Sequence, residues 1–256
     1  MQVFDRYSRY YNLLNADKDY AAECRYVETL LREANPGIRS ILELGSGTAR
    51  HARHLAESGI RVCGVERSNT MLASGRAVLD QAPAELRQHI ELVPGDARSV
   101  RLERTFDAVM SLFHVVSYQT SNQDLAALFA TARAHLGPKG VFLFDYWHGP
   151  GVLTDPPVFR VKEGEDETLK VERTARPELL PRANMVKVHF SVTAWDKTAG
   201  TTEQIEEVHP MRYLFEPELD LLLSAAGFRV RRTVAWLGQE PPSRETWLAC
   251  TIAEAE

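Results

Sequence analysis

The stretch Ile41-Leu42-Glu43-Leu44-Gly45-Ser46-Gly47-Thr48-Ala49-Arg50 decides the fold, because it combines a buried strand, a glycine turn and the start of a helix. Its first four residues are apolar enough for a central strand of a parallel sheet. The two glycines permit positive φ and let a ligand approach the backbone. Thr48 is expected to cap a helix that begins at Ala49. Because the free N–H groups of such a helix start attract polar or negative groups, the stretch predicts a nucleotide-like cofactor site.

Two interpretations of this turn compete: a dinucleotide site, as in dehydrogenases, and a site for a different cofactor. Dehydrogenases that bind dinucleotides carry G-x-G-x-x-G, whose third glycine would fall at Arg50. A bulky arginine there would hold helix and strand apart. Glu43, just before the first glycine, would repel a pyrophosphate, but it can accept hydrogen bonds from an ammonium group or an ordered water. The turn therefore disfavours a dinucleotide and favours a cofactor that carries an ammonium group.

Composition limits the class of protein further. With 256 residues and 44% hydrophobic content, the chain can bury the core of one domain with an elaboration. A net charge of −5 without a basic stripe indicates small-molecule chemistry and no nucleic-acid partner. The three cysteines have no metal spacing, and we find no apolar leader and no membrane-spanning run. We therefore expect a soluble, cytoplasmic protein with reduced thiols, no metal and no membrane contact.

Strand and helix patterns alternate in the first part of the chain. Strands are expected at residues 41–44, 61–65, 89–93, 106–113 and 141–144, with helices at residues 52–56 and 124–136 and another capped by Ser68. An amphipathic helix near residues 21–31 precedes the first strand, so this segment can fold over the cofactor. Such repeats predict an α/β fold with a doubly wound, mainly parallel, Rossmann-like sheet.

The pattern changes after Pro156. Residues 158–161, 169–172, 186–195 and 204–214 alternate apolar and polar side chains without helices, which predicts an inserted antiparallel sheet. A helix and two strands follow, at residues 216–226, 228–236 and 247–252, and fit a hairpin that completes seven strands. The expected division is a cofactor-binding domain of residues 1–155 and 214–256, and an inserted subdomain of residues 156–213 that forms a substrate roof or a dimer contact.

Two carboxylates extend the cofactor prediction. Glu66 ends the second strand nineteen residues after Gly47, where one carboxylate can accept from both hydroxyls of a ribose. Asp96 follows the third strand and suits the exocyclic amine of adenine, although an ordinary turn aspartate is the competing interpretation. Met71 can pack beside the adenine or belong to the core. Together these residues predict a cofactor that carries a ribose.

The motif Glu43-x-Gly45-x-Gly47, Glu66, Asp96 and the strand at 106–111 occur in the order that resembles class I S-adenosylmethionine-dependent methyltransferases. More narrowly, the chain is similar to N,N-dimethyltransferases of nucleotide-linked aminodeoxy sugars. This second resemblance rests on the inserted sheet and on Tyr11-Asn12, Lys18-Asp19-Tyr20 and Thr48-Ala49-Arg50-His51. The chain departs from that group's Tyr-Asp at Tyr11-Asn12, glycine at Ala49 and Gly-His at Ser117-Tyr118. The last departure lies beside the transferable methyl group and leaves the amine substrate open.

The resemblance implies S-adenosylmethionine as the cofactor and assigns its parts to residues. The methionine end would contact Glu43, Gly45, Ser46 and Gly47, with Tyr11 and Tyr20 closing over it. Glu66 would hold the ribose, and Asp96 and Ala97 the adenine. The backbone of Ser111 and Leu112 would pass under the sulfonium, and Arg67 and Met71 complete the expected cofactor-binding set.

Methyl transfer from a sulfonium is an in-line displacement, so alignment and exclusion of water are the main contributions of a protein. His114 and Tyr118 are the predicted catalytic residues. His114 is a candidate general base, with a buried structural histidine as the equal alternative. Tyr118 can orient an amine as an acceptor but is a poor base unless its pKa is lowered. His51 and His54 are expected to be solvated helix positions.

Three functions remain open from the sequence. The first is methyl transfer to the amino group of a small molecule, with a nucleotide-linked deoxysugar as the best candidate. The second is O- or C-methylation of another metabolite, which His114 as a base would favour. The third is cofactor binding without turnover, and a dehydrogenase is a remote fourth. The exposed edges of the inserted sheet also predict a possible homodimer.

Overall fold

The computed structural model describes residues 6–256, so residues 1–5 of the expected cofactor-binding domain lie outside the described part. The described chain forms a seven-stranded sheet in the order β10-β11-β5-β4-β1-β2-β3 and a four-stranded sheet in the order β6-β7-β8-β9. In the large sheet, neighbouring strands from β3 to β5 run parallel, whereas β11 pairs antiparallel with β5 and β10. The predicted mainly parallel sheet with an antiparallel insertion is confirmed.

The large sheet consists of β1 (Ser40–Leu44), β2 (Arg61–Glu66), β3 (Ile90–Pro94), β4 (Phe106–Ser111), β5 (Leu136–Trp147), β10 (Phe228–Ala235) and β11 (Leu248–Ala255). The inserted sheet consists of β6 (Arg160–Glu165), β7 (Leu169–Leu180), β8 (Met185–Asp196) and β9 (Thr201–Arg212). The helices are η1 (Tyr7–Tyr10), α1 (Tyr11–Leu14), α2 (Tyr20–Ala34), α3 (Arg50–Glu57), α4 (Asn69–Asp80), α5 (Ala84–Arg87), η2 (Val116–Tyr118), α6 (Asn122–Ala134), α7 (Gly149–Thr154), η3 (Pro181–Ala183) and α8 (Glu216–Ala225). Within residues 6–256, no helix has the length and apolarity needed to cross a bilayer.

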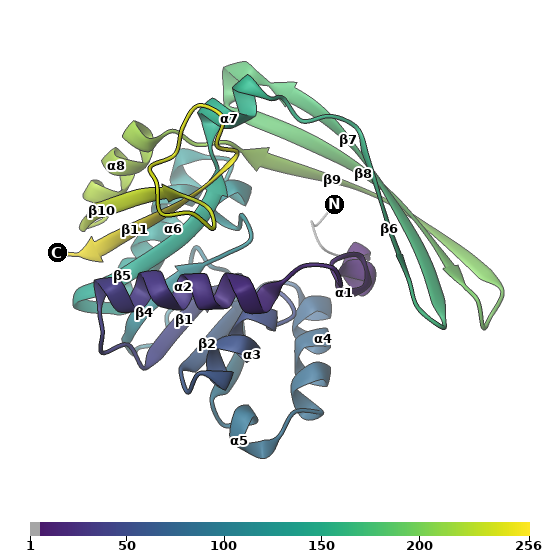
Figure 1. Ribbon diagram of the computed structural model, residues 1–256, viewed down its shortest axis with the longest axis horizontal. Coiled ribbons are helices and arrows are strands. Elements are labelled where there is room, and N and C mark those ends of the chain that lie inside the picture. Colours follow the sequence, from purple (N-terminus) through teal and green to yellow (C-terminus); the bar gives the residue numbers. More distant parts are fainter. Residues whose placement is uncertain (1–5) are drawn as a thin grey trace.

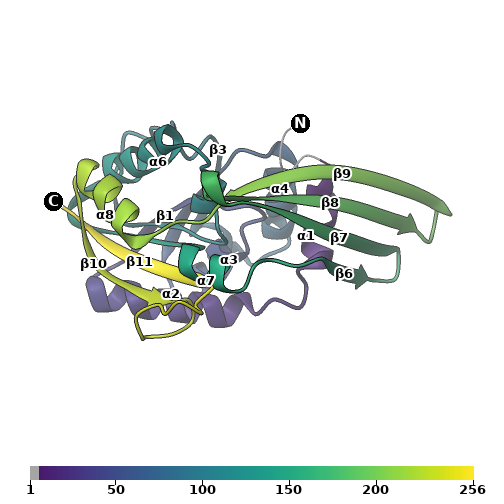
Figure 2. The same cartoon turned by 90° about the horizontal axis from the view of Figure 1, so that it is seen from above.

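Helices cover both faces of the large sheet (Figure 2). Ile41 packs into a core cluster with residues of α2 and α3, whereas its neighbour Leu42 packs into a second cluster with residues of α6 and α8. Successive side chains of a strand point to opposite faces, so a strand buried on both faces must be apolar throughout. This explains the unbroken apolar run that precedes the glycine turn.

The inserted sheet projects away from the large sheet as four long strands, with α1 beside it (Figure 1). Tyr7, Tyr10 and Leu14 of the N-terminal segment are buried in one cluster with Val192 and Ile205 of the inserted sheet. The N-terminal segment therefore joins the inserted sheet to the edge of the large sheet where the glycine turn lies.

The predicted cap of the first crossover helix is wrong. Helix α3 begins at Arg50, and its N-cap residue, Ala49, takes a left-handed conformation with φ of 61° and makes no side-chain cap. The hydroxyl of Thr48 instead donates to Asn12 Oδ1 at 2.8 Å. A contact from the N-terminal segment, which the local sequence does not reveal, has replaced the cap. The predicted cap at Ser68 is confirmed, since its side chain accepts from Met71 N.

Several strand boundaries differ from the prediction: β7, for example, continues to Leu180 instead of ending at residue 172, and β6 runs from Arg160 to Glu165 instead of residues 158–161. Strand β4 ends at Ser111 rather than at residue 113, because Phe113 and His114 have positive φ of 60° and 65° and leave the extended conformation. Strand β5 begins at Leu136, so residues 137–138 lie in the strand and do not end a helix, since α6 stops at Ala134.

Candidate functional site

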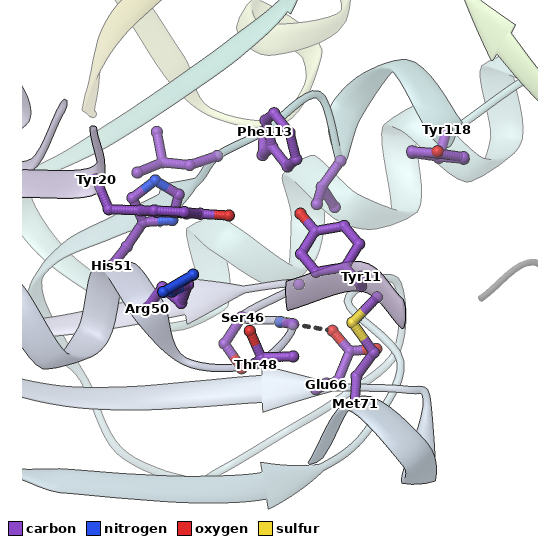
Figure 3. A pocket seen from close by; sticks show the side chains of 14 residues that line it. Tyr11, Tyr20, Ser46, Thr48, Arg50, His51, Glu66, Met71, Phe113 and Tyr118 are labelled. Carbon is purple, nitrogen blue, oxygen red and sulfur yellow. Dashed lines mark hydrogen bonds between the residues drawn. The ribbon is translucent and has the colours of Figure 1, made fainter. Parts of the chain in front are cut away.

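Two adjoining cavities lie at the carboxyl ends of β1, β2 and β4, where a doubly wound sheet places its ligand. Figure 3 shows the first of them. They share four lining residues, Gly45, Glu66, Val115 and Tyr118, and so form one cleft. We call the part beneath Tyr20 the turn side and the part beside Asp96 the distal side.

Most of the predicted site residues line this cleft. On the turn side these are Tyr11, Tyr20, Gly45, Ser46, Gly47, Glu66, Met71, Leu112 and Tyr118. The distal side adds Arg67, Asp96 and Ala97. Figure 3 shows Tyr11 and Tyr20 facing Ser46, Thr48 and Glu66 across the turn side. The tertiary structure thus brings together residues as far apart in the sequence as Tyr11 and Tyr118.

Three predicted residues do not line the cleft. Glu43 is buried just behind the turn, and the Ser111 hydroxyl donates to the Leu44 carbonyl at 3.0 Å. His114 lies against Asp145: its backbone N–H donates to Asp145 Oδ1, and its Nδ1 is 2.9 Å from Oδ2 without the alignment of a hydrogen bond. Of the two predicted catalytic side chains, the cleft therefore contains Tyr118.

Several lining residues were not predicted. The turn side adds Thr48, Arg50, His51, Phe113 and Val115, and the distal side adds Arg98, Gln119 and Pro210. Arg50 and His51 follow the glycine turn directly, and this position at a helix start was a signal that could have identified them. Pro210 comes from β9 of the inserted sheet, and no local pattern connects it with the cleft.

The conformation of the glycine turn is fixed by Glu66. Gly45 and Gly47 have φ of 83° and 56°, and a Cβ on Gly45 would lie 2.6 Å from the side chain of Val115. Gly47 N–H donates to Glu66 Oε2 at 2.8 Å, and Ser68 N–H donates to Oε1 at 2.7 Å. Glu66 thus holds two loops with one carboxylate while it faces both sides of the cleft.

A chain of charges runs beneath the turn side. Lys18 Nζ lies 2.5 Å from Glu23 Oε1, Glu23 Oε2 lies 3.0 Å from His51 Nε2, and His51 Nδ1 lies 3.6 Å from Glu43 Oε1. Burial alone would lower the pKa of His51, but the carboxylates of Glu23 and Glu43 raise it to about 8. Burial raises the pKa of Glu43. The positive charge of the His51 imidazolium therefore stabilises the carboxylates of Glu23 and Glu43.

The prediction that His51 is solvated is wrong, because the residue is only 6% exposed. It lies on the face of α3 that packs against α2, which supplies Glu23. His54, one turn later, is about one-third exposed and pairs with Glu57 on its own helix, as a solvated position should.

Buried polar atoms at the turn side fit an amino-acid group. Glu43 Oε2, Ser46 Oγ and Arg50 Nη1 have no hydrogen-bond partner within residues 6–256. Unpaired buried groups are costly, so these atoms indicate a ligand that carries complementary charges. A carboxylate together with a guanidinium and a hydroxyl complements an α-amino and an α-carboxyl group.

The distal side combines a fixed carboxylate with apolar walls. Hydrogen bonds from Arg98 hold the pKa of Asp96 below its usual value. The Arg98 guanidinium contacts both oxygens of Asp96, at 2.9 and 2.6 Å, and also reaches Asp124. Val65, Ala97 and Val115 provide the apolar surface. This side can accept a flat ring with a hydrogen-bond donor at its edge.

Comparison with known proteins agrees with this geometry. Residues 41–140 match the family described as a methyltransferase domain. The dTDP-3-amino-3,4,6-trideoxy-alpha-D-glucopyranose N,N-dimethyltransferase of Streptomyces venezuelae is 31% identical over 228 residues, which cover 88% of this chain and 90% of the relative. The dTDP-3-amino-3,6-dideoxy-alpha-D-glucopyranose N,N-dimethyltransferase of Streptomyces fradiae is 30% identical, with 83% and 79% covered.

Solved structures with similar folds cover nearly the whole chain. DesVI from Streptomyces venezuelae superposes with a TM-score of 0.76 at 26% identity, covering 96% of this chain and 95% of its own. The sugar N-methyltransferase KedS8 from Streptoalloteichus gives a TM-score of 0.79 at 26% identity, covering 97% and 92%. The likeness thus extends through the inserted sheet.

Proposed function

The chain belongs to the class I S-adenosylmethionine-dependent methyltransferases, in the group that contains the dTDP-aminosugar N,N-dimethyltransferases, and from this membership we propose that it methylates the amino group of a nucleotide-linked aminodeoxysugar. The observation that carries the proposal is the single cleft that runs from the glycine turn to Pro210 of the inserted sheet. In this proposal the cofactor occupies the cleft along the large sheet, and the acceptor approaches beside Tyr118 and Pro210, where the inserted sheet borders the cleft.

The unpartnered groups of the cleft suit S-adenosylmethionine, which supplies an electrophilic methyl group on sulfur. In our proposal, Arg50 holds the carboxyl group of the methionine end with Ser46 beside it, and Glu43, buried just behind the turn, accepts from the amino group directly or through an ordered water. Glu66 accepts from the ribose, and Asp96 and Ala97 contact the adenine. The further members of the proposed set are Tyr11, Tyr20, Gly45, Gly47, Arg67, Met71 and the backbone of Ser111 and Leu112.

Residues of this chain contribute alignment and exclusion of water. Tyr11 and Tyr20 cover the turn side, and their rings shield it from solvent. Tyr118 lines both sides of the cleft, and we propose that its hydroxyl oxygen accepts a hydrogen bond from the acceptor amine. An amine that is neutral needs no strong base, and this suits a cleft in which His114 is absent from the lining. A hydroxyl acceptor would need such a base.

A mass-spectrometric screen tests the proposed substrate class. The full chain is incubated with S-adenosylmethionine and a panel of dTDP-linked aminodeoxysugars, each paired with the sugar that carries a hydroxyl in place of the amine. We expect one or two methyl groups on the aminosugars, release of S-adenosylhomocysteine, and no product from the hydroxyl analogues. Methylation of the hydroxyl analogues, or no product from any aminosugar, would contradict the proposal.

We also propose that the enzyme is a cytoplasmic homodimer in which two inserted sheets meet. Phe159, just before β6, and Val161, within it, are each more than half exposed, and β6 is an edge strand of its sheet. Val161→Glu is expected to convert a dimer into a monomer in sedimentation velocity, whereas Leu221→Glu on the exposed face of α8 is expected to leave the dimer intact. A monomeric wild-type protein would refute the dimer.

The three free cysteines are all buried, which suits a reducing compartment such as the cytoplasm.

A further inference from the structure

A buried chain of hydrogen bonds joins the inserted sheet to the methyl-transfer cleft. The hydroxyl of Tyr118, at the end of η2, lies 2.9 Å from His209 Nδ1 on β9. His209 Nε2 lies 3.1 Å from Glu207 Oε2 on the same strand. His209 is 1% exposed and Glu207 is 4% exposed, so water does not compete for these contacts.

The partners determine which atoms carry protons. Glu207 Oε1 accepts from the backbone N–H of Tyr7 at 3.1 Å, so Glu207 acts as an acceptor through both oxygens. We therefore assign the His209 proton to Nε2, from which it is donated to Glu207. Nδ1 is then the acceptor, and the Tyr118 hydroxyl donates to it. Burial lowers the pKa of His209, which favours this neutral form, and burial raises the pKa of Tyr118, which keeps its hydroxyl protonated.

We propose that His209 and Glu207 are positioning residues that hold the Tyr118 hydroxyl as a donor to His209, so that the phenolic oxygen is presented to the acceptor nucleophile as a hydrogen-bond acceptor. The proposal rests on the proposed amine acceptor. An N–H donated to Tyr118 fixes the orientation of the amine and directs its lone pair elsewhere, toward the methyl group. A phenol free to rotate could instead donate to the nitrogen and block that lone pair.

The arrangement gives the inserted sheet a part in catalysis. Its strand β9 supplies both positioning residues as well as Pro210 at the cleft wall. A phenol can rotate about its C–O bond, so it needs an external group to fix the direction of its proton. His209 meets that need in this chain.

The pH dependence follows from the charges around His209. Among the described residues, it is faced by Glu207 on β9, Tyr118 on η2, Tyr7 on η1 and Arg173 on β7. Because its pKa is lowered, His209 is neutral and accepts from Tyr118 at neutral pH. It becomes an imidazolium only at pH values below 6.5, the ordinary pKa of histidine. Nδ1 then carries a proton and donates to Tyr118, whose own proton must turn away. The rate is expected to fall as pH drops through that range.

Kinetics of three variants test the proposal with the dTDP-aminodeoxysugar that the screen identifies. Tyr118→Phe and His209→Phe are each expected to lower kcat about 100-fold while S-adenosylmethionine affinity stays within about twofold. The double variant should be no slower than either single variant, because each substitution already removes the hydrogen bond between Tyr118 and His209. His209→Gln, whose amide oxygen can accept from Tyr118, should recover part of the rate. His189→Gln, an exposed position on β8, is the control and should match wild type.

Two further measurements separate positioning from a structural role. The acid limb of kcat should disappear in Tyr118→Phe. In the full chain, nitrogen NMR of His209 should show a protonated Nε2 and an accepting Nδ1 whose resonance moves in Tyr118→Phe, whether or not any sugar is methylated. Additive losses in the double variant, an acid limb that persists, or a protonated Nδ1 at neutral pH would overturn the proposal. A correct NMR signature with no methylated aminosugar would instead refute the proposed substrate.

Discussion

Replacing His51 by leucine is expected to weaken S-adenosylmethionine binding by about 100-fold at neutral pH. The substitution removes the cation between Glu23 and Glu43 and leaves two carboxylates buried beneath the glycine turn. The pKa of Glu43, already raised by burial, should rise further, so that this residue becomes neutral and binds an ammonium group weakly. Isothermal titration calorimetry with the full chain measures the loss.

The same histidine should make stability depend on pH. Its pKa in the folded protein is about 8, above its ordinary value of 6.5, so the stabilisation is fully present below pH 6.5 and is lost as pH rises through about 8. The free energy of unfolding of the wild type should therefore fall by about 2 kcal/mol between these conditions. Denaturant titrations at several pH values should show this fall in wild type and lose it in His51→Leu.

His54→Leu is the matched control, because it changes the same residue type one turn along the same helix, where the side chain is partly exposed and pairs only with Glu57 among the described residues. It should alter neither cofactor affinity nor the pH dependence. Equal effects of the two substitutions would show that the charge chain beneath the turn is not what holds the cofactor end.

Replacing Glu66 by alanine should have a larger effect, a loss of about 1,000-fold in S-adenosylmethionine affinity. The substitution removes the acceptor for two backbone donors, Gly47 N–H and Ser68 N–H, and removes the proposed partner of the ribose. Hydrogen bonds to a charged group contribute about 1.5–3 kcal/mol each, so losing several is enough for this effect. The glycine turn should also become mobile, which amide hydrogen exchange at Gly47 would detect.

Two comparisons make this result specific. Glu66→Gln keeps one acceptor oxygen and should bind with intermediate affinity. Glu91→Ala removes a carboxylate from the neighbouring strand β3, where Glu91 pairs with Arg104 at an exposed position, and should leave affinity unchanged. Wild-type affinity in Glu66→Ala would refute both the role of Glu66 in the turn and its proposed contact with the ribose.

The sequence by itself determined the sheet, the glycine turn and the cofactor class. Strands buried on both faces must be continuously apolar, and a turn that approaches a ligand needs residues with positive φ. Both requirements are therefore visible in the local sequence, as an apolar run and as glycines. The acidic residue at a strand end is equally local, which is why the position of Glu66 could be predicted from the strand pattern alone. These features depend on the chain within a few residues of each position.

Only the tertiary structure decided which side chains meet at the cleft. His51 and His54 look alike in the sequence, and the burial of His51 depends on Glu23, which lies 28 positions away on another helix. Tyr118 and His209 are 91 positions apart and meet because the inserted sheet packs over the cleft. The protonation state of a buried group is set by the charges that folding brings close to it, and these charges cannot be inferred from the neighbouring residues in the sequence.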